Sequence, residues 1–301
     1  MHSLYDIRIG TLVDGRGPDV PARLRALLPL GFESFSITYW QDLGEVDLAR
    51  QAEEVRGALA TSTAVISSLA VFGNPLERDD QAAATRAAWA AAIRHAHDFG
   101  CDVVGGFAGR LRGLPLPDSI PRFVEVFAPL AELAAKHGVR LAFENCAMGG
   151  TWASGDWNIA HNPDAWELMF AALPAAHVGL EWEPCHQLVQ LIDAFPQLDA
   201  WHQRIFHVHG KDASIDRHRL ARHGFAGKRE WSWHRTPGFG DSDWTAIISR
   251  LRQVDWKGSI DIEGWHDPVY RDELEMNGQV QALRHLQQCR GGIAPVLVPK
   301  G

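Results

Sequence analysis

Carboxylate and histidine side chains end four apolar segments in the second half of the chain. The four residues are Glu144, Glu183, His209 and Glu263. A β-strand points residues two apart to the same side, so Glu181 and Glu183 face the same way, and the sequence leaves open which of them reaches a site. Pro184 cannot donate a hydrogen bond to a sheet and stops this strand. His186, three residues past Glu183, can therefore turn back over the strand end.

Three carboxylates and one imidazole form an oxygen-rich set of metal ligands. Such a set suits one Mn2+ or Mg2+ ion, with Mn2+ favoured and Co2+ or Zn2+ as alternatives. A cation with open positions would hold a substrate carbonyl and the adjacent hydroxyl and acidify the neighbouring C–H. A carboxylate beside it could then move the proton, and the expected intermediate is an enediolate. Each residue alone has a structural explanation, but four at consecutive strand ends favour a metal site.

The rest of the chain alternates strand-like and helix-like segments. The eight strand-like segments are 7–13, 34–39, 65–72, 102–107, 141–144, 178–183, 205–209 and 258–263. Glycines such as Gly100 and Gly138 follow the helical segments, as is usual just past a helix end. Eight units without a break in composition predict an α/β fold, a single (β/α)8 TIM barrel over residues 1–290 with a tail at 291–301. No Gly-x-Gly-x-x-Gly loop follows the first strand, which argues against dinucleotide binding.

Two segments are too long for ordinary connections between a strand and a helix. They are residues 145–158 and 210–242, and both are rich in polar and aromatic residues. Active sites of such barrels lie at the C-terminal ends of the strands, so we expect both segments to line the site. The candidate substrate contacts beside His186 are Asn145, Trp157, His161 and Lys211. A tryptophan here could stack on a sugar or only cover the barrel mouth, and Lys211 could meet substrate or pair with an acid.

Composition and charge narrow the function classes. The 301-residue chain has a formal charge of -8 and a pI near 6.0, which argues against a nucleic-acid surface. Its four cysteines are widely spaced, as in proteins that keep reduced thiols. No signal peptide and no apolar run of membrane length is recognisable, so a cytoplasmic, membrane-free protein is expected.

Five motifs carry a resemblance to a known family. They are Phe143-Glu144-Asn145, Glu183-Pro184-Cys185-His186, His207-Val208-His209-Gly210-Lys211-Asp212, Pro237-Gly238-Phe239-Gly240-Asp241 and Ser259-Ile260-Asp261-Ile262-Glu263. Together they resemble the sugar phosphate isomerase/epimerase family, whose fold is the xylose isomerase-like TIM barrel. The resemblance implies that Glu144, Glu183, His209 and Glu263 are metal ligands. It also implies that Glu144 and Glu263 transfer protons and that His186 acts with them as a substrate-binding histidine. The family commonly has Asp where this chain has Glu183.

The resemblance implies a divalent-metal-dependent isomerase or epimerase of a sugar or keto-sugar, which we expect to be non-phosphorylated. An alternative is a 3-keto-glycoside lyase, as in the catalytic subunit of a C-glycoside deglycosidase, in which removal of the C2 proton expels the C1 substituent. A homo-oligomer is expected, or a hetero-complex with a small partner subunit under the alternative. A non-catalytic sugar-binding subunit is a third hypothesis, and the intact ligand set counts against it.

Overall fold

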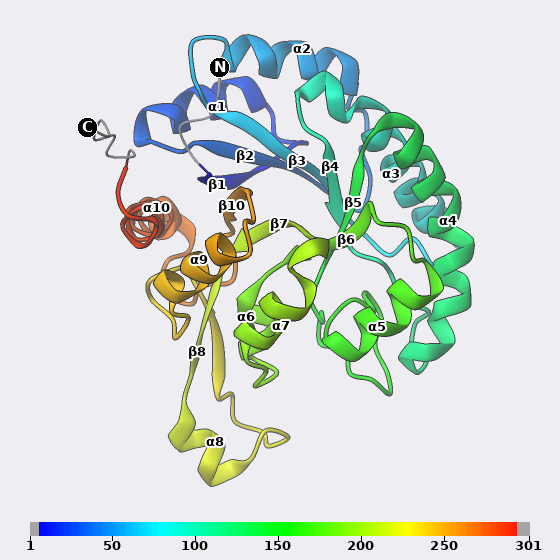
Figure 1. Cartoon of the computed structure of the whole chain (residues 1–301), viewed down its shortest axis with the longest axis vertical. Helices are drawn as coiled ribbons and strands as arrows, with labels where there is room; N and C mark the ends of the chain where they lie inside the picture. The colour runs from blue at the N-terminus through cyan, green and yellow to red at the C-terminus, as the bar shows by residue number, and fades with distance from the viewer. Residues whose placement is uncertain (1–5, 294–301) are drawn as a thin grey trace.

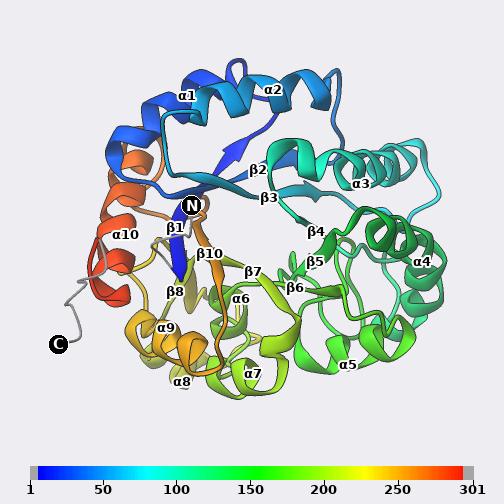
Figure 2. The same ribbon diagram turned by 45° about the horizontal axis from the view of Figure 1, so that its top comes forward.

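Eight parallel strands close into a barrel in the computed structural model, which describes residues 6–293 (Figures 1 and 2). The strands are β1 (Ile7–Asp14), β2 (Ser34–Trp40), β3 (Val65–Phe72), β4 (Val103–Gly106), β5 (Arg140–Glu144), β6 (Val178–Trp182), β7 (Ile205–Gly210) and β10 (Gly258–Ile262). Neighbours in the barrel follow chain order, and β10 pairs with β1 to close the ring. The predicted (β/α)8 barrel is therefore confirmed. The expected tail at 291–301 lies mostly outside the described residues.

Helices surround the barrel (Figure 2). The α-helices are α1 (Val20–Leu27), α2 (Leu48–Leu59), α3 (Asp80–Phe99), α4 (Ile120–His137), α5 (Pro163–Ala172), α6 (Pro184–Leu188), α7 (Ala194–Trp201), α8 (Arg217–His223), α9 (Trp244–Gln253) and α10 (Glu275–Arg290), and 3-10 turns lie at Leu28–Leu30, Leu116–Ser119, His202–Arg204 and Asp272–Leu274. As predicted, Gly100 and Gly138 end α3 and α4, with left-handed φ angles of 82° and 66°. No helix within residues 6–293 is long and apolar enough to cross a membrane.

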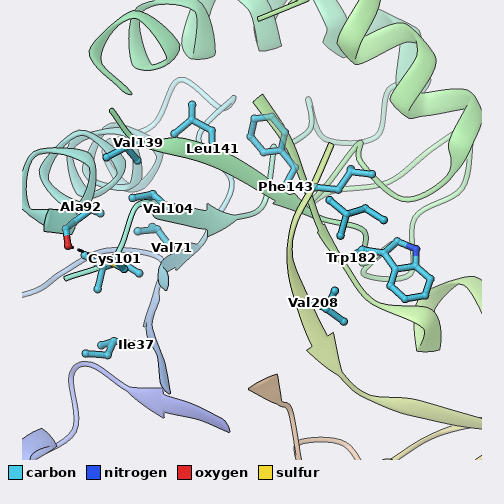
Figure 3. Close-up of a cluster of buried hydrophobic side chains, with 14 of the residues drawn as sticks. Ile37, Val71, Ala92, Cys101, Val104, Val139, Leu141, Phe143, Trp182 and Val208 are labelled. Carbon is cyan, nitrogen blue, oxygen red and sulfur yellow. Dashed lines mark hydrogen bonds between the residues drawn. The ribbon is translucent and has the colours of Figure 1, made fainter. Parts of the chain in front are cut away.

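The hydrophobic core lies between the barrel and its helices. On β5, Leu141 and Phe143 belong to this core (Figure 3). The ring of Phe143 meets that of Phe127 on α4 edge-on, with centroids 4.7 Å apart. Side chains alternate along a strand, so Ala142 and Glu144 point the other way, into the barrel. The packing that buries the outward face of β5 thus aims Glu144 at the barrel interior.

The interior of the barrel is polar at its centre. Barrels of this type are normally filled by layers of branched apolar side chains. Here the buried interior residues include Ser34, Ser36, Ser68, Glu181, His207, His209 and Asp261. Gly105 on β4 leaves the room that Glu181 needs, because a Cβ at residue 105 would lie 2.8 Å from Glu181 Oε1. Charged groups therefore run from the middle of the barrel to the strand ends.

A buried ionic contact joins the last helix to the first strands. Arg290 on α10 donates from Nη2 to Glu33 Oε1 at 2.8 Å and from Nη1 to the Ile7 carbonyl at 2.8 Å. Glu33 Oε2 accepts the backbone N–H of Ile9 at 3.0 Å, and Gln287 Nε2 donates to Glu33 Oε1 at 3.2 Å. We call Glu33 and Arg290 the clasp, because they join α10 to the N-terminal ends of β1 and β2.

A hairpin arm projects from the barrel (Figure 1). It consists of β8 (Asp212–Ile215) and β9 (Ser232–Arg235), which pair antiparallel, with α8 between them. No residue of α8 is buried, and the Phe225 side chain beside it is 75% exposed. The sequence predicted a long polar segment here but not the hairpin.

Candidate metal centre

Four neighbouring strands bring the four predicted ligand residues to one place. Glu144 is the last residue of β5, and His209 lies near the end of β7. Glu183 and Glu263 directly follow β6 and β10. Since β5, β6, β7 and β10 are consecutive around the barrel, these side chains converge at the C-terminal ends of the strands. All four are buried, and one donor atom from each lies within 4.8 Å of the others. We call these four residues the quartet.

Nδ1 of His209 faces the three carboxylates of the quartet. It lies 3.0 Å from Glu144 Oε1, 3.4 Å from Glu183 Oε2 and 3.4 Å from Glu263 Oε2. Two ligand atoms at right angles around a cation of the size of Mg2+ are about 3 Å apart. The spacing of the quartet is therefore that of side chains sharing one ion.

Several carboxylate oxygens of the quartet make no hydrogen bond within the described residues. Neither oxygen of Glu183 nor Oε2 of Glu263 has a hydrogen-bond partner within residues 6–293. Buried polar atoms are normally paired, because leaving them unpaired is costly. Lys211 Nζ lies 2.7 Å from Glu263 Oε1 and 3.6 Å from Glu183 Oε1. With His209 neutral and the three carboxylates ionised, as ligands must be, these carboxylates and the Lys211 ammonium group leave two negative charges, which a divalent cation would balance. The residues therefore fit such an ion.

Burial and neighbouring charges shift the pKa values of the quartet in different directions. Burial raises the pKa of Glu144 well above its usual range and also raises that of Glu183. Burial acts the same way on Glu263, but the charges of Lys211 and His209 outweigh it and hold the pKa of this carboxyl well below its usual range. Burial would lower the pKa of Lys211, yet Glu183 and Glu263 raise it well above normal. Lys211 therefore stays charged beside the quartet.

The other carboxylate of the β6 segment lies deeper in the barrel. Glu181 Oε1 is 2.7 Å from His207 Nδ1 and 3.2 Å from His209 Nε2. Burial raises the pKa of Glu181, but the His209 charge and the hydrogen bond from His207 outweigh it and lower the pKa to about 2. The structure thus places Glu183 with the other carboxylates of the quartet and Glu181 on the opposite side of the His209 ring.

Three of the expected substrate contacts, Asn145, His161 and Trp157, do not line the cavity. Asn145 donates from Nδ2 to the Glu183 carbonyl at 2.8 Å and accepts the Glu183 N–H at 2.6 Å. It is fully buried, so it fixes the backbone at Glu183 instead of facing a substrate. His161 is also buried, and its Nδ1 lies 3.4 Å from Gln190 Oε1. Gln190 lines the cavity, and His161 lies behind it.

A cavity of about 630 Å3 lies over the quartet. The polar part of its wall includes Glu144, His186, Lys211 and Glu263, and the apolar part includes Leu12, Trp40, Phe72, Phe107, Met148 and Trp265. His186 Nε2 lies 3.2 Å from Glu183 Oε1. The Trp157 ring packs against Trp40 with centroids 5.7 Å apart and so supports the wall from behind. The volume is that of a site for a ligand of drug-like size.

Sequence reasoning missed Trp40 and Phe72 of the apolar wall, and it missed the polar layer under His209. Trp40 and Phe72 end β2 and β3, and nothing in their sequence context separates them from core aromatics. His207 could have been found, because it lies two residues before His209 on one strand and so faces the same side. Asp261 stands in the same relation to Glu263.

The fold and the quartet together define a (β/α)8 barrel with a candidate active site at the C-terminal ends of its strands. Residues 24–289 match the family model described as xylose isomerase-like TIM barrel, and the chain belongs to this family.

Similar proteins were found by sequence and by structure. The inosose dehydratase of Lactiplantibacillus plantarum is 28% identical over 160 residues, a match that covers 52% of this chain and only 50% of that enzyme. The crystal structure of 3-keto-D-glucoside 4-epimerase from E. coli has a TM-score of 0.69 at 16% identity, covering 94% of this chain and 100% of that one. The structure of L-ribulose 3-epimerase has a TM-score of 0.68 at 17% identity, covering 94% and 96%. At such identities the structural likeness shows the fold.

Proposed function

We propose that this protein is a divalent-metal-dependent isomerase or epimerase of a sugar or keto-sugar. The observation that carries the proposal is the convergence of the quartet at the cavity, with carboxylate oxygens left unpaired. The similar proteins support it, since they are named as epimerases of sugars and as a dehydratase of an inosose. Mn2+ is the proposed ion, with Mg2+, Co2+ or Zn2+ as alternatives.

The quartet would hold the cation, which when bound polarises a substrate carbonyl and acidifies the neighbouring C–H. Glu144 and Glu263 stand at the ends of β5 and β10, with β6 and β7 between them, and both line the cavity. One carboxylate would remove a proton from the substrate carbon, and the other would return a proton to the substrate. An enediolate links the two transfers.

Lys211 and His186 would complete the polar face that meets the substrate. The Lys211 ammonium group lies 2.7 Å from Glu263 Oε1 and would stabilise negative charge that develops on a substrate oxygen bound beside this carboxylate. Burial first, and the charge of Lys211 second, hold the pKa of His186 well below normal. His186 is therefore neutral at physiological pH and available to hydrogen-bond a sugar hydroxyl. Trp157 contributes through Trp40, against which it packs.

Proton NMR of the Mg2+-loaded protein in D2O, with free ketoses and 3-keto-glycosides offered separately, tests the proposal. Incorporation of deuterium into a free ketose, together with the appearance of an isomer, is the expected result. A protein that binds the cation and leaves every ketose unexchanged would count against an isomerase or epimerase of free sugars.

The apolar wall of the cavity supports a second candidate function, that of a 3-keto-glycoside lyase. Its apolar wall, with Trp40, Met148 and Trp265 at the exposed rim, has room for an apolar group attached to the C1 atom of a sugar. Removal of the C2 proton by Glu144 or Glu263 would then expel this group. Release of the aglycone from the 3-keto-glycoside, without exchange in free ketoses, would support the lyase.

We further propose a cytoplasmic homo-oligomer, with the hairpin arm as the contact between copies. Residues 216–230 carry five Arg or Lys side chains against two acidic ones, whereas the whole chain has a formal charge of -8. A basic arm with an exposed Phe225 suits contact with a second copy, because the chain as a whole is acidic. Sedimentation of the wild-type protein and of Phe225→Ser at low and high salt tests this contact, and a salt-independent monomer would rule it out.

A further inference from the structure

A series of buried side chains leads from His209 to the centre of the barrel. His209 Nε2 makes no hydrogen bond within residues 6–293, but it lies 3.2 Å from Glu181 Oε1, an ion-pair distance, and the same oxygen is 2.7 Å from His207 Nδ1. His207 Nε2 lies 2.6 Å from Asp261 Oδ2, and Ser34 donates to Asp261 Oδ1 at 2.5 Å. All five residues are buried. This series begins at Nε2 of His209, whereas the carboxylates of the quartet lie at Nδ1 of the same ring.

We propose that Glu181 is a positioning residue that fixes the His209 ring with Nδ1 toward the carboxylates of the quartet. The two ring nitrogens of an imidazole can each act as the ligand atom, and a flip of the ring exchanges them. With a cation among the carboxylates at Nδ1, the negative charge of Glu181 3.2 Å from Nε2 holds the proton on Nε2 and leaves the Nδ1 lone pair for the cation. The inference deepens the proposed function and rests on it, because it requires that the quartet hold a cation.

His207 in turn holds Glu181 in place. Both of its ring nitrogens face carboxylates, Nδ1 that of Glu181 and Nε2 that of Asp261, so its ring cannot turn without breaking two contacts. Glu181 Oε2 has no hydrogen-bond partner within the described part of the chain. The position of the Glu181 carboxylate therefore depends on His207 and on the shape of the space around it.

Gly105 shapes that space. A Cβ atom at residue 105 would lie 2.8 Å from Glu181 Oε1 and 3.1 Å from both Cδ and Oε2. The φ angle of Gly105 is not among the left-handed ones, so alanine can adopt the local backbone conformation. Gly105→Ala thus displaces the Glu181 carboxylate without changing any charge in the barrel.

Glu181, His207 and His209 are also close enough to share an ion of their own. Both nitrogens of His207 are already engaged with carboxylates, which leaves this residue no free lone pair for a cation. The geometry therefore assigns these residues to the orientation of His209 and not to a second cation site.

The test compares Glu181→Leu, Glu181→Gln and Gly105→Ala with the wild-type protein. Isothermal titration with Mn2+ measures the affinity of the quartet, and long-range 1H–15N NMR of the Mg2+-loaded protein reads which nitrogen of His209 carries the proton. We expect the Kd of Glu181→Leu to rise about 10- to 100-fold, as for other residues that orient metal-binding histidines. Glu181→Gln keeps one acceptor oxygen, so its Kd should lie between those of wild type and Glu181→Leu.

The matched control is Ser68→Ala. Ser68 donates to Ser36 at 2.8 Å inside the same barrel, and within residues 6–293 it shares no hydrogen bond with His209, Glu181 or His207. Its Kd and the His209 tautomer should equal those of wild type, while Gly105→Ala should shift both. Wild-type affinity and an unchanged tautomer in both Gly105→Ala and Glu181→Gln would overturn the inference, even if Glu181→Leu failed to fold. A wild-type protein that binds no cation would overturn the proposed function as well, and the two failures are thereby distinguished.

Discussion

Two buried sets of charges lie at opposite ends of this barrel, the quartet and the clasp. In the clasp, each oxygen of Glu33 accepts a hydrogen bond from Arg290, and Oε2 also accepts the Ile9 N–H. In the quartet, both oxygens of Glu183 and one of Glu263 are without a hydrogen-bond partner among residues 6–293. The side chains of both sets are almost inaccessible to solvent.

Burial and charge alone therefore do not separate a structural ionic contact from a ligand site. What separates them is whether the polar atoms are satisfied by the protein itself. In a buried ionic pair whose hydrogen bonds are all made, removal of one partner destabilises the fold, because the other charge is left buried and uncompensated. A buried group with unpaired oxygens aimed at one point destabilises the fold until a ligand arrives. The comparison predicts that substitutions in the two sets act on different measurable quantities.

The largest expected effect is the loss of turnover in Glu183→Ala and Glu263→Ala. Loss of cation binding removes several kcal/mol of transition-state stabilisation, so turnover should fall by about a thousandfold or more. Steady-state kinetics and metal analysis of the purified variants measure this. Glu53→Ala, a change at an exposed carboxylate on α2, is the control and should behave as wild type. Full activity in both quartet variants would contradict the site assignment.

Substitution in the clasp should change stability and leave the site intact. Glu33→Leu removes the carboxylate from Arg290, and breaking a buried ionic pair costs about 3–5 kcal/mol of the free energy of unfolding. Urea denaturation measures this loss. The Mn2+ affinity should stay at the wild-type value, so a Glu33→Leu protein that binds Mn2+ poorly while folded would break the distinction between the two sets.

Removal of the cation should destabilise only proteins with an intact quartet. A ligand at a hundred times its Kd stabilises the native state by about 2.7 kcal/mol. Chelation by EDTA should therefore lower the melting temperature of wild type and of Glu33→Leu alike. Glu183→Ala should melt at the same temperature with and without EDTA. An EDTA effect of equal size in Glu183→Ala would place the cation elsewhere.

The smallest predicted effect is the pH dependence of cation binding. The pKa values of Glu144 and Glu183 are raised by burial, so in the cation-free protein these carboxyls hold their protons to higher pH than ordinary carboxyls do. A cation needs them deprotonated, so binding releases protons and the affinity rises as the pH rises above the usual Glu range. Calorimetry in buffers of different ionisation enthalpy counts the released protons. Glu144→Gln should release fewer, and equal release in both proteins would refute this linkage.

The sequence predicted much of the barrel because local signals mark its elements. All eight barrel strands lie within or close to the predicted segments, and Gly100 and Gly138 end helices as expected. The hairpin arm was missed because β8 and β9 are only four residues long, and the buried and half-buried residues do not alternate along either strand.

The site was predictable only in part, because the sequence marks the strand ends but not the contacts that form when the barrel closes. Strand ends are visible in sequence, and the quartet follows from them. The choice between Glu181 and Glu183 depends on their height in the barrel, which only the assembled ring defines. Asn145 looked like a substrate contact, but it bonds to the backbone of Glu183, a contact across 38 residues that no local pattern reveals.

Closure of the ring has a consequence for synthesis of the chain. β1 pairs with β10, from Ile7 opposite Gly258, and Arg290 reaches Glu33 across 257 positions. On the ribosome, β1 leaves the exit tunnel long before its partner has been translated, so one sheet edge stays open for most of elongation. A nascent chain stalled before Arg290 would present that edge to chaperones and proteases, which can therefore tell an unfinished copy from a completed one.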